Sequence, residues 1–166
     1  MLKMNQILEE AEERAAEYKK AVIETGGKEE DYQPINIQID YKVGYSSDKV
    51  VSFVILKSET LASAYTERYF YNIDIETGKE LNLRDIFGKD YKKIVDEAIY
   101  TEIEQRSKNP DNVYFTKEEG GFSGIENEYQ DFYINEEGKV VIVFEKYEIA
   151  PGSMGIQEFV IDKKVF

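Results

Sequence analysis

The sequence of 166 residues contains no cysteine, no histidine and no tryptophan, and it has only three prolines. The lack of cysteine excludes disulfides, thiolate zinc sites and cysteine nucleophiles. The lack of histidine removes the usual general base, the usual zinc ligand and every Ser-His-Asp arrangement. The commonest hydrolase and metalloenzyme mechanisms are therefore excluded, and we expect no cofactor and no metal.

A long apolar segment is absent as well. No run of about 18 apolar residues occurs, so we expect no membrane span in this chain. The first segment, MLKMNQILEEAEERAAEYKK, is too acidic and too polar for a signal peptide. We therefore expect either a cytosolic protein or a soluble part of a longer precursor with its anchor upstream. The residues alone leave both open, as they leave the oligomeric state open.

The charge is strongly unbalanced, with 34 acidic against 21 basic residues and a formal net charge of −13. An acidic surface repels phosphate backbones, so we expect no nucleic-acid partner. The same surface attracts a cationic partner and speeds its arrival, although charge that serves only solubility would give the same composition. The 13 tyrosines offer a protein ligand broad contact area at low entropic cost.

Apolar periodicity predicts two main helices and six strands. One helix covers residues 7–22 and ends at Gly26-Gly27, because glycine readily takes the left-handed conformation that ends helices. The other begins at Tyr91, with Asp90 as its N-cap, and stops before Asn109-Pro110. Three strand patterns follow each helix. The predicted class is α+β, a mostly antiparallel sheet with two main helices packed on one face.

The chain shows no repeat and no linker, so residues 1–166 are predicted to form a single domain. Residues 1–48 hold the N-terminal helix and first strand, and residues 50–161 hold the core. The strand Val140–Phe144 is apolar at every position, which is typical of a central strand covered on both faces. Residues 111–130 are predicted to form a long loop or a lid, with Phe122 among its glycines and acids.

A second loop interrupts the last two strands at residues 145–156. Pro151 fixes φ there, and Gly152 and Gly155 permit tight backbone paths, so we expect a rigid shape. Tyr147 and Glu148 then offer a recognition surface beside Met154, whose flexible thioether adapts to irregular partners. The alternative is that Tyr147 and Glu148 only bond to the backbone of the loop itself.

Ordered motifs along the chain suggest a family. A strand ending in Asp-x-x-Thr-Gly-Lys is followed by Leu-x-Asp-Ile-Phe, then by Phe-Tyr, and finally by Tyr-Glu-Ile-Ala-Pro with a later glycine and Glu-Phe. These motifs lie at Asp74, Thr77, Gly78, Lys79, Leu83, Asp85, Ile86, Phe87, Phe132-Tyr133, Tyr147–Pro151, Gly155 and Glu158-Phe159. The set resembles the uncharacterised domain of RsiV-type anti-sigma factors and of some peptidoglycan deacetylases. It covers roughly residues 50–161.

The resemblance implies a non-catalytic, extracytoplasmic domain that binds or senses a ligand at the cell envelope. In RsiV-type proteins the domain binds lysozyme, a cationic protein, so the expected partner is a cationic protein or a peptidoglycan component. The expected binding residues are Tyr147, Glu148, Pro151, Met154, Gly155 and Phe122. A Gly-Gly-Ala-His segment that many family members carry is replaced here by ETLASAYTERY, so no role of that segment transfers.

Two other functions are compatible with the composition. A carboxylate-based glycan hydrolase needs two acids and no histidine, and Glu145, Glu148 and Glu158 are the candidates because they flank the second loop. A calcium site would need six to eight oxygens, and the acids of residues 118–131 lack the Asp-x-[Asp/Asn]-x-[Asp/Asn]-Gly spacing. The binding module remains the main prediction, with the hydrolase as the alternative.

Overall fold

The computed structural model describes residues 4–60 and 64–164. The chain falls into two compact units, one of Met1–Tyr41 with Ile55–Tyr69 and one of Lys42–Val54 with Phe70–Phe166. The single domain stays a prediction. Part of the ETLASAYTERY segment, residues 61–63, lies outside the described residues.

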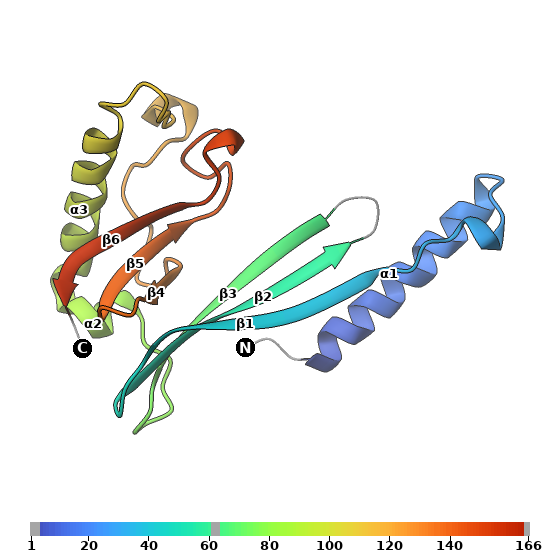
Figure 1. The fold of residues 1–166 in the computed structure, drawn as a ribbon, viewed down its shortest axis with the longest axis horizontal. Helices are drawn as coiled ribbons and strands as arrows, with labels where there is room; N and C mark the ends of the chain where they lie inside the picture. Colours follow the sequence, from blue (N-terminus) through green and yellow to red (C-terminus); the bar gives the residue numbers. More distant parts are fainter. Residues whose placement is uncertain (1–3, 61–63, 165–166) are drawn as a thin grey trace. The chain divides into compact units, whose positions relative to one another are not determined.

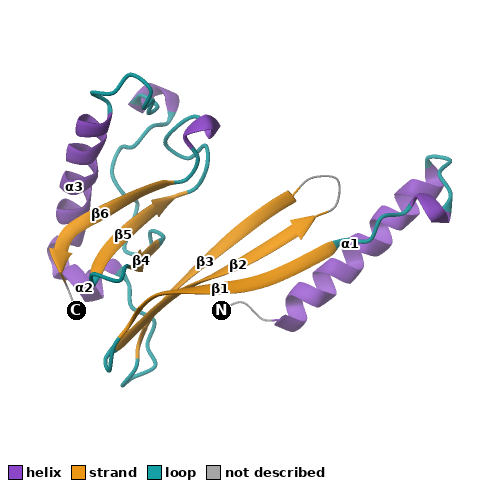
Figure 2. Ribbon diagram, in the orientation of Figure 1, coloured by secondary structure: helices purple, strands orange, loops and turns teal. Residues whose placement is uncertain are grey.

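The helices and strands follow the predicted order: a helix, three strands, a helical region and three more strands (Figures 1 and 2). The main elements are α1 (Met4–Glu24), β1 (Asn36–Ser46), β2 (Val50–Thr60), β3 (Ala64–Asp74), α2 (Leu83–Phe87), α3 (Tyr91–Arg106), β4 (Phe132–Ile134), β5 (Lys139–Phe144) and β6 (Gln157–Lys164). The strands form two antiparallel three-stranded sheets, ordered β1-β2-β3 and β4-β5-β6. The α+β class is confirmed, and the strands are divided between two sheets.

The first unit contains α1. Its predicted apolar stripe is half-buried along the helix, with Ile7 buried, and the helix ends just before Gly26, whose φ is +86°. The ring of Tyr18 contacts that of Tyr32 with 5.6 Å between centroids. The first unit also contains residues 55–69 of β2 and β3. In this part of the sheet Lys57 on β2 forms an ion pair with Glu67 on β3, with 2.7 Å between Nζ and Oε2.

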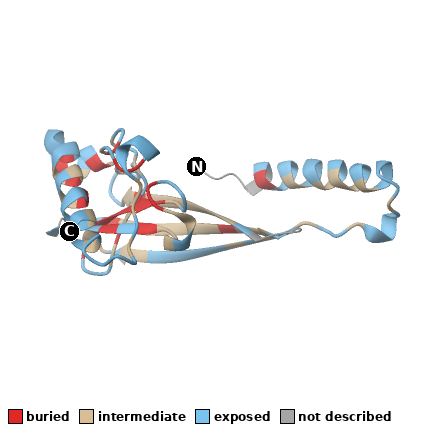
Figure 3. Cartoon of the chain, turned by 90° about the horizontal axis from the view of Figure 1, so that it is seen from above, coloured by how far each residue is buried: buried red, intermediate tan, exposed pale blue. Residues whose placement is uncertain are grey.

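The second unit holds the main hydrophobic core. β5 is its central strand, and Val140–Phe144 are buried at every position, as predicted (Figure 3). Helix α3 lies along β6 and buries Val95 and Ile99 completely (Figure 1). Because α2 and α3 cover this sheet, its long apolar strand is shielded from water on the side they occupy.

The edge of β4 that does not pair with β5 forms hydrogen bonds with polar side chains of β2 and β3. Ser52 Oγ donates to Asn72 Oδ1 at 2.7 Å, and Ile134 N donates to Ser52 Oγ at 2.8 Å. Asn72 Nδ2 donates to Phe132 O at 3.0 Å. A Cβ on Gly44 would lie 2.5 Å from Ile134 O, so only glycine permits this approach of β1. The backbone groups of a short edge strand are thereby satisfied.

The helix caps differ from the prediction in one respect. Asp90 stands at the N-cap of α3, but its side chain makes no capping hydrogen bond. A 3-10 turn, Gly88–Asp90, leads directly into the helix and gives Asp90 φ −91° and ψ 11°, outside the extended region that capping needs. The side-chain cap belongs to α2 instead, where Asn82 accepts from Asp85 N at 3.0 Å and Asp85 accepts from Asn82 N at 3.1 Å.

Candidate functional site

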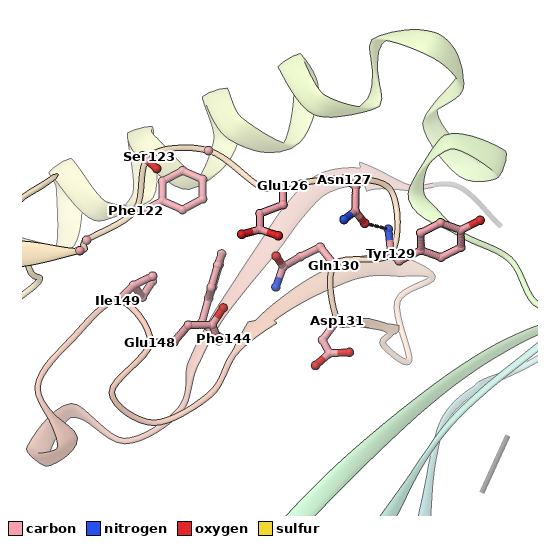
Figure 4. Close-up of a pocket in the computed structure, with 13 residues that line it drawn as sticks. Phe122, Ser123, Glu126, Asn127, Tyr129, Gln130, Asp131, Phe144, Glu148 and Ile149 are labelled. Carbon is pink, nitrogen blue, oxygen red and sulfur yellow. Dashed lines mark hydrogen bonds between the residues drawn. The ribbon is translucent and has the colours of Figure 1, made fainter.

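A pocket of about 500 Å³ opens between the loop that precedes β4 and the chain that follows β5 (Figure 4). Glycines, acids, amides and aromatic rings line it. The lining residues are Gly120, Gly121, Phe122, Ser123, Gly124, Glu126, Asn127, Tyr129, Gln130, Asp131, Phe144, Glu148 and Ile149. Its volume falls within the range of about 300–1,000 Å³ that small-molecule sites occupy.

The loop before β4 is fixed to the core at several points. Ile125 is buried, and its N–H donates to Asp96 Oδ1 on α3 at 2.8 Å. Val143 N on β5 donates to Asp131 O at 2.9 Å, and Gln130 Nε2 donates to Val143 O at 3.0 Å. The segment predicted as a long loop or lid is therefore a loop that hydrogen bonds hold against α3 and β5. It forms one wall of a pocket that is already present without a ligand.

The floor of the pocket is apolar. Phe122 and Phe144 pack edge to face, with ring centroids 5.6 Å apart, and Ile149 lies buried beside them. Phe122 is only 7% exposed, so this predicted binding residue serves mainly as core and offers the pocket one side of its ring. A Cβ on Gly121 would lie 1.9 Å from Phe115 O, which is why glycine stands where the wall turns above this floor.

Three carboxyl groups line the pocket, those of Glu126, Asp131 and Glu148, and no lysine or arginine does. Burial of the carboxyl end raises the pKa of Glu148, and the charges of Asp131, Glu145 and Glu126 raise it further, while the N–H of Glu145 opposes the shift. Burial also raises the pKa of Asp131, with Glu145 adding to it. Glu148 is exposed as a whole residue, but its carboxyl end loses hydration inside the pocket. The three carboxyl groups give the pocket a negative field suited to a cation.

Tyr147 stands on the loop that follows β5 in an unusual backbone conformation. Its φ is +75°, and its side chain is 66% exposed. A Cβ on Gly152 would lie 2.1 Å from Cζ of Tyr147, so the ring rests directly on that glycine. Lys146 Nζ lies 5.2 Å from the ring centroid. Backbone strain of this kind costs about 1–2 kcal/mol and gathers at functional sites.

The rest of the loop is rigid, as its residue types predict. Met154 N donates to Pro151 O at 2.8 Å, and Gly155, with φ +68°, ends the turn. The buried side chain of Gln157 donates to Met154 O at 2.8 Å and anchors the turn to β6. Glu148 Oε2 accepts from Glu145 N at 2.7 Å, so this carboxyl group also closes the loop backbone.

The structure brings only part of the predicted site together. Phe122 and Glu148 line the pocket. Tyr147, Pro151, Met154 and Gly155 lie on the same loop as Glu148 but are not among the lining residues. Sequence reasoning missed a set from the other wall: Glu126, Asn127, Tyr129, Gln130 and Asp131. The signal that pointed to them was the long loop rich in glycine and acids, whose contacts with β5 no local pattern specifies.

The acids proposed for hydrolysis are also separated. Glu148 lines the pocket, but Glu145 and Glu158 do not. Glu158 accepts from Tyr133 OH at 3.4 Å, and burial together with this carboxylate raises the pKa of Tyr133 to about 12. Within residues 4–60 and 64–164, no group of three or more acids is placed to hold a metal ion. Over the same residues, no helix is long and apolar enough to cross a membrane.

The family motif at residues 74–87 builds local structure. Thr77 donates to Asp74 Oδ1 through both N and Oγ1, at 2.8 and 2.7 Å. Lys79 Nζ lies 2.7 Å from Asp85 Oδ1, and this ion pair ties the turn after β3 to the cap of α2. These residues therefore hold a turn and a helix start, which accounts for their spacing without a ligand.

Known proteins share the fold and part of the sequence of this chain. Residues 84–164 match the family described as "Protein of unknown function (DUF3298)". Two solved structures share the fold. A DUF3298 family member from Bacteroides fragilis is 20% identical, with a TM-score of 0.63 over 96% of this chain and 66% of that one. A member from Pseudomonas aeruginosa is 18% identical, with a TM-score of 0.57 over 88% of this chain and 64% of that one.

The stretch that matches this family, residues 84–164, makes up just under half of the chain. Over 131 residues the chain is 33% identical to the anti-sigma-V factor RsiV of Bacillus subtilis. The matching region covers 76% of this chain and 46% of that protein. The chain therefore spans about half the length of this relative. The resemblance inferred from the ordered motifs is confirmed.

Proposed function

We propose that this chain is a non-catalytic sensing domain that binds a cationic ligand in the pocket between the two loops. One observation carries the proposal: a preformed pocket of about 500 Å³ is lined by three carboxyl groups and no basic side chain. The likeness to an anti-sigma factor supports a regulatory role. Binding that relieves repulsion among these acids would be favourable without any chemical step.

The apolar floor gives such a ligand a second kind of contact. A lysine or arginine side chain buries its aliphatic stem against rings and keeps its charged end among carboxylates. Phe144 and Ile149 offer that surface, and Glu126 and Glu148 line the same pocket (Figure 4). A protein rich in surface lysine and arginine fits this chemistry, and so does a peptidoglycan fragment that carries an amino group.

The loop that follows β5 adds a rim to the proposed site. Tyr147 holds an exposed ring on a strained and rigid backbone, and Met154 stands two residues beyond Gly152, on which that ring rests. A rigid, exposed tyrosine contributes contact area at low entropic cost. We assign Tyr147 and Met154 to the partner-facing rim, while Pro151 and Gly155 shape the turn.

Isothermal titration of the full chain with lysozyme and with soluble peptidoglycan fragments tests the proposal. We expect binding to at least one of them, and an affinity about tenfold lower for Glu148→Gln because one carboxylate is lost from the pocket. Glu136→Gln is the matched control, since Glu136 is an exposed acid in the turn between β4 and β5. Binding that responds equally to both variants, or no binding at all, would refute the assignment.

A carboxylate-based glycan hydrolase is the second candidate. The observation that favours it is the raised pKa of both Glu148 and Asp131 in one pocket, since retaining and inverting glycosidases need one carboxyl that stays protonated. Muramidase and chitinase assays separate the two functions. Turnover that is abolished in Glu148→Gln while ligand binding persists would establish the enzyme and end the sensing proposal.

We also assign the domain to the outer side of the cell membrane, as the RsiV-type resemblance implies. Protease treatment of intact cells that express the full-length gene product tests this. Digestion of the domain in intact cells, with a cytoplasmic marker protected, is the expected result. Protection of the domain until the cells are lysed would place it inside.

A further inference from the structure

A second and smaller pocket adjoins the first one. Its volume is about 230 Å³. Its lining residues are Phe70, Asn72, Glu80, Leu81, Asn82, Glu128, Tyr129, Gln130, Asp131 and Phe132. The two pockets share Tyr129, Gln130 and Asp131, so a single backbone segment forms the wall between them.

The smaller pocket repeats the chemistry of the larger one. It has apolar walls from Phe70, Leu81 and Phe132, acids at Glu80, Glu128 and the shared Asp131, and no lysine or arginine among its lining residues. Its volume lies below the range of about 300–1,000 Å³ that is usual for small-molecule ligands. It therefore suits a single side chain better than a whole ligand.

The shared wall is rigid, so the two pockets keep a fixed separation. Leu83 N donates to Glu128 O at 3.0 Å, and Tyr91 OH donates to Glu128 Oε2 at 3.2 Å. Tyr129 N donates to Asn127 Oδ1 at 2.8 Å, which is the bond drawn in Figure 4. Since the charge of Glu128 is partly offset by Arg84, whose Nε lies 3.6 Å from Oε1, Glu80 and Asp131 carry the negative charge of the smaller pocket.

The top of the wall carries an exposed aromatic ring. Tyr129 is 75% exposed, and Figure 4 shows its ring directed away from the side chains of the larger pocket. A peptide that crosses the wall would lie over this ring. Aromatic rings attract both the aliphatic stems and the charged ends of lysine and arginine.

We propose that the two pockets are adjoining subsites for two basic side chains of one extended peptide segment, which crosses the wall at Tyr129. The inference rests on the proposed function, and it specifies the ligand as a basic-x-basic sequence of a partner protein. Residues i and i+2 of an extended chain point to the same side and lie roughly 7 Å apart. Two basic side chains on one side of such a segment can enter the two pockets that residues 129–131 separate.

An NMR titration of the full chain with two pentapeptides tests the subsites. Gly-Arg-Gly-Arg-Gly presents two basic side chains, and Gly-Arg-Gly-Gln-Gly presents one. We expect both peptides to shift the amide signals of Tyr129, Gln130 and Asp131, and the dibasic peptide to bind about tenfold more tightly because the second contact is intramolecular.

Variants assign the two pockets. Glu80→Gln is expected to reduce the affinity of the dibasic peptide to that of the monobasic one and to leave monobasic binding nearly unchanged. Glu148→Gln is expected to weaken both peptides, and Glu136→Gln, on the β4–β5 turn, serves as the charge-matched control. Circular dichroism of each variant confirms that the fold is intact.

The failures of the two proposals are distinguishable. Equal affinity for the two peptides, or no effect of Glu80→Gln beyond that of the control, overturns the second subsite and leaves cation binding in the larger pocket standing if Glu148→Gln still weakens it. No shift at residues 129–131 with either peptide overturns the pair of subsites. If lysozyme and peptidoglycan fragments also fail to bind, the sensing proposal falls with it.

Discussion

At the scale of single residues, Tyr147 is the clearest departure from ordinary backbone geometry. It is the non-glycine residue with a positive φ among those the structure describes, and its ring is supported from below by Gly152. A tyrosine in this conformation costs stability that a glycine would not. The strained backbone of Tyr147 thus holds an exposed aromatic ring next to Glu148, which lines the pocket.

Comparing two substitutions at Tyr147 isolates the strain. Tyr147→Gly and Tyr147→Ala both lose the ring, but only glycine takes a φ of +75° without penalty. We expect the glycine variant to be more stable than the alanine variant by about 1 kcal/mol in urea denaturation. The same pair at Tyr129, whose φ is not positive, is the control and should favour alanine. The same order at both positions would show that Tyr147 carries no strain.

Glu148 gives a prediction about pH. Because its pKa is raised in the folded state, the folded protein binds this proton more readily than the unfolded chain does. This one group therefore reduces stability above its raised pKa, and the penalty disappears as the pH falls through the window between the raised and the unfolded pKa. We expect Glu148→Gln to stabilise the protein near pH 7 and to lose this advantage at acidic pH.

Urea denaturation of the wild type and Glu148→Gln between pH 4 and 8 measures the difference. Taking a difference is essential, since Asp74 and Asp85 have lowered pKa values and lose stability on acidification in both proteins. Glu136→Gln again supplies the control. A difference that grows toward acidic pH would contradict the raised pKa of Glu148.

At the scale of elements, β4 depends on other strands to close its edge. This strand has only three residues, Phe132–Ile134, and its outer backbone groups bond to side chains of β2 and β3. Removing such a partner leaves a buried donor unsatisfied, which is costlier than losing an ordinary hydrogen bond. The polar pair Ser52 and Asn72 is thus a structural requirement of the second unit.

Ser52→Ala is expected to lower the free energy of unfolding by about 1–3 kcal/mol, because Ile134 N loses its acceptor. Hydrogen exchange of the Ile134 amide should accelerate more than that of the other β4–β5 amides. Ser58→Ala is the matched control on the same strand, since the Ser58 hydroxyl is part-buried and pairs with Thr66. Equal effects of the two variants would show that the β4 edge does not depend on Ser52.

At the scale of the whole molecule, net charge governs encounter with a partner. A chain of net charge −13 attracts a cationic protein over distances that salt shortens. We expect the association rate constant with lysozyme to fall about tenfold or more between 20 and 300 mM NaCl in stopped-flow measurements. Glu148→Gln should change dissociation more than association, because it removes a pocket contact. An association rate independent of salt would exclude electrostatic steering.

Local sequence signals predicted most of the elements correctly. The glycine pair after α1, the apolar run of β5 and the start of α3 at Tyr91 were all recognisable, because each depends on backbone preference or on side-chain alternation within a few residues. Asp90 stands at the predicted N-cap position, but it forms no side-chain capping bond, because a preceding 3-10 turn takes its backbone out of the extended region. Phe122 lines the pocket as well as packing against Phe144 in the core, and its role in binding stays a prediction.

The sequence by itself determined the classes of chemistry that are excluded, the order of helices and strands, the acidity and the family. It did so because composition is independent of the fold, and because periodicity and motifs depend on residues close together in the sequence. Only the tertiary structure decided that the strands form two sheets and that Glu126, Asp131 and Glu148 line one pocket. Long-range packing of two loops on β5 puts these residues around one pocket, and the raised pKa values of Glu148 and Asp131 arise from burial and from the charges of neighbouring carboxylates.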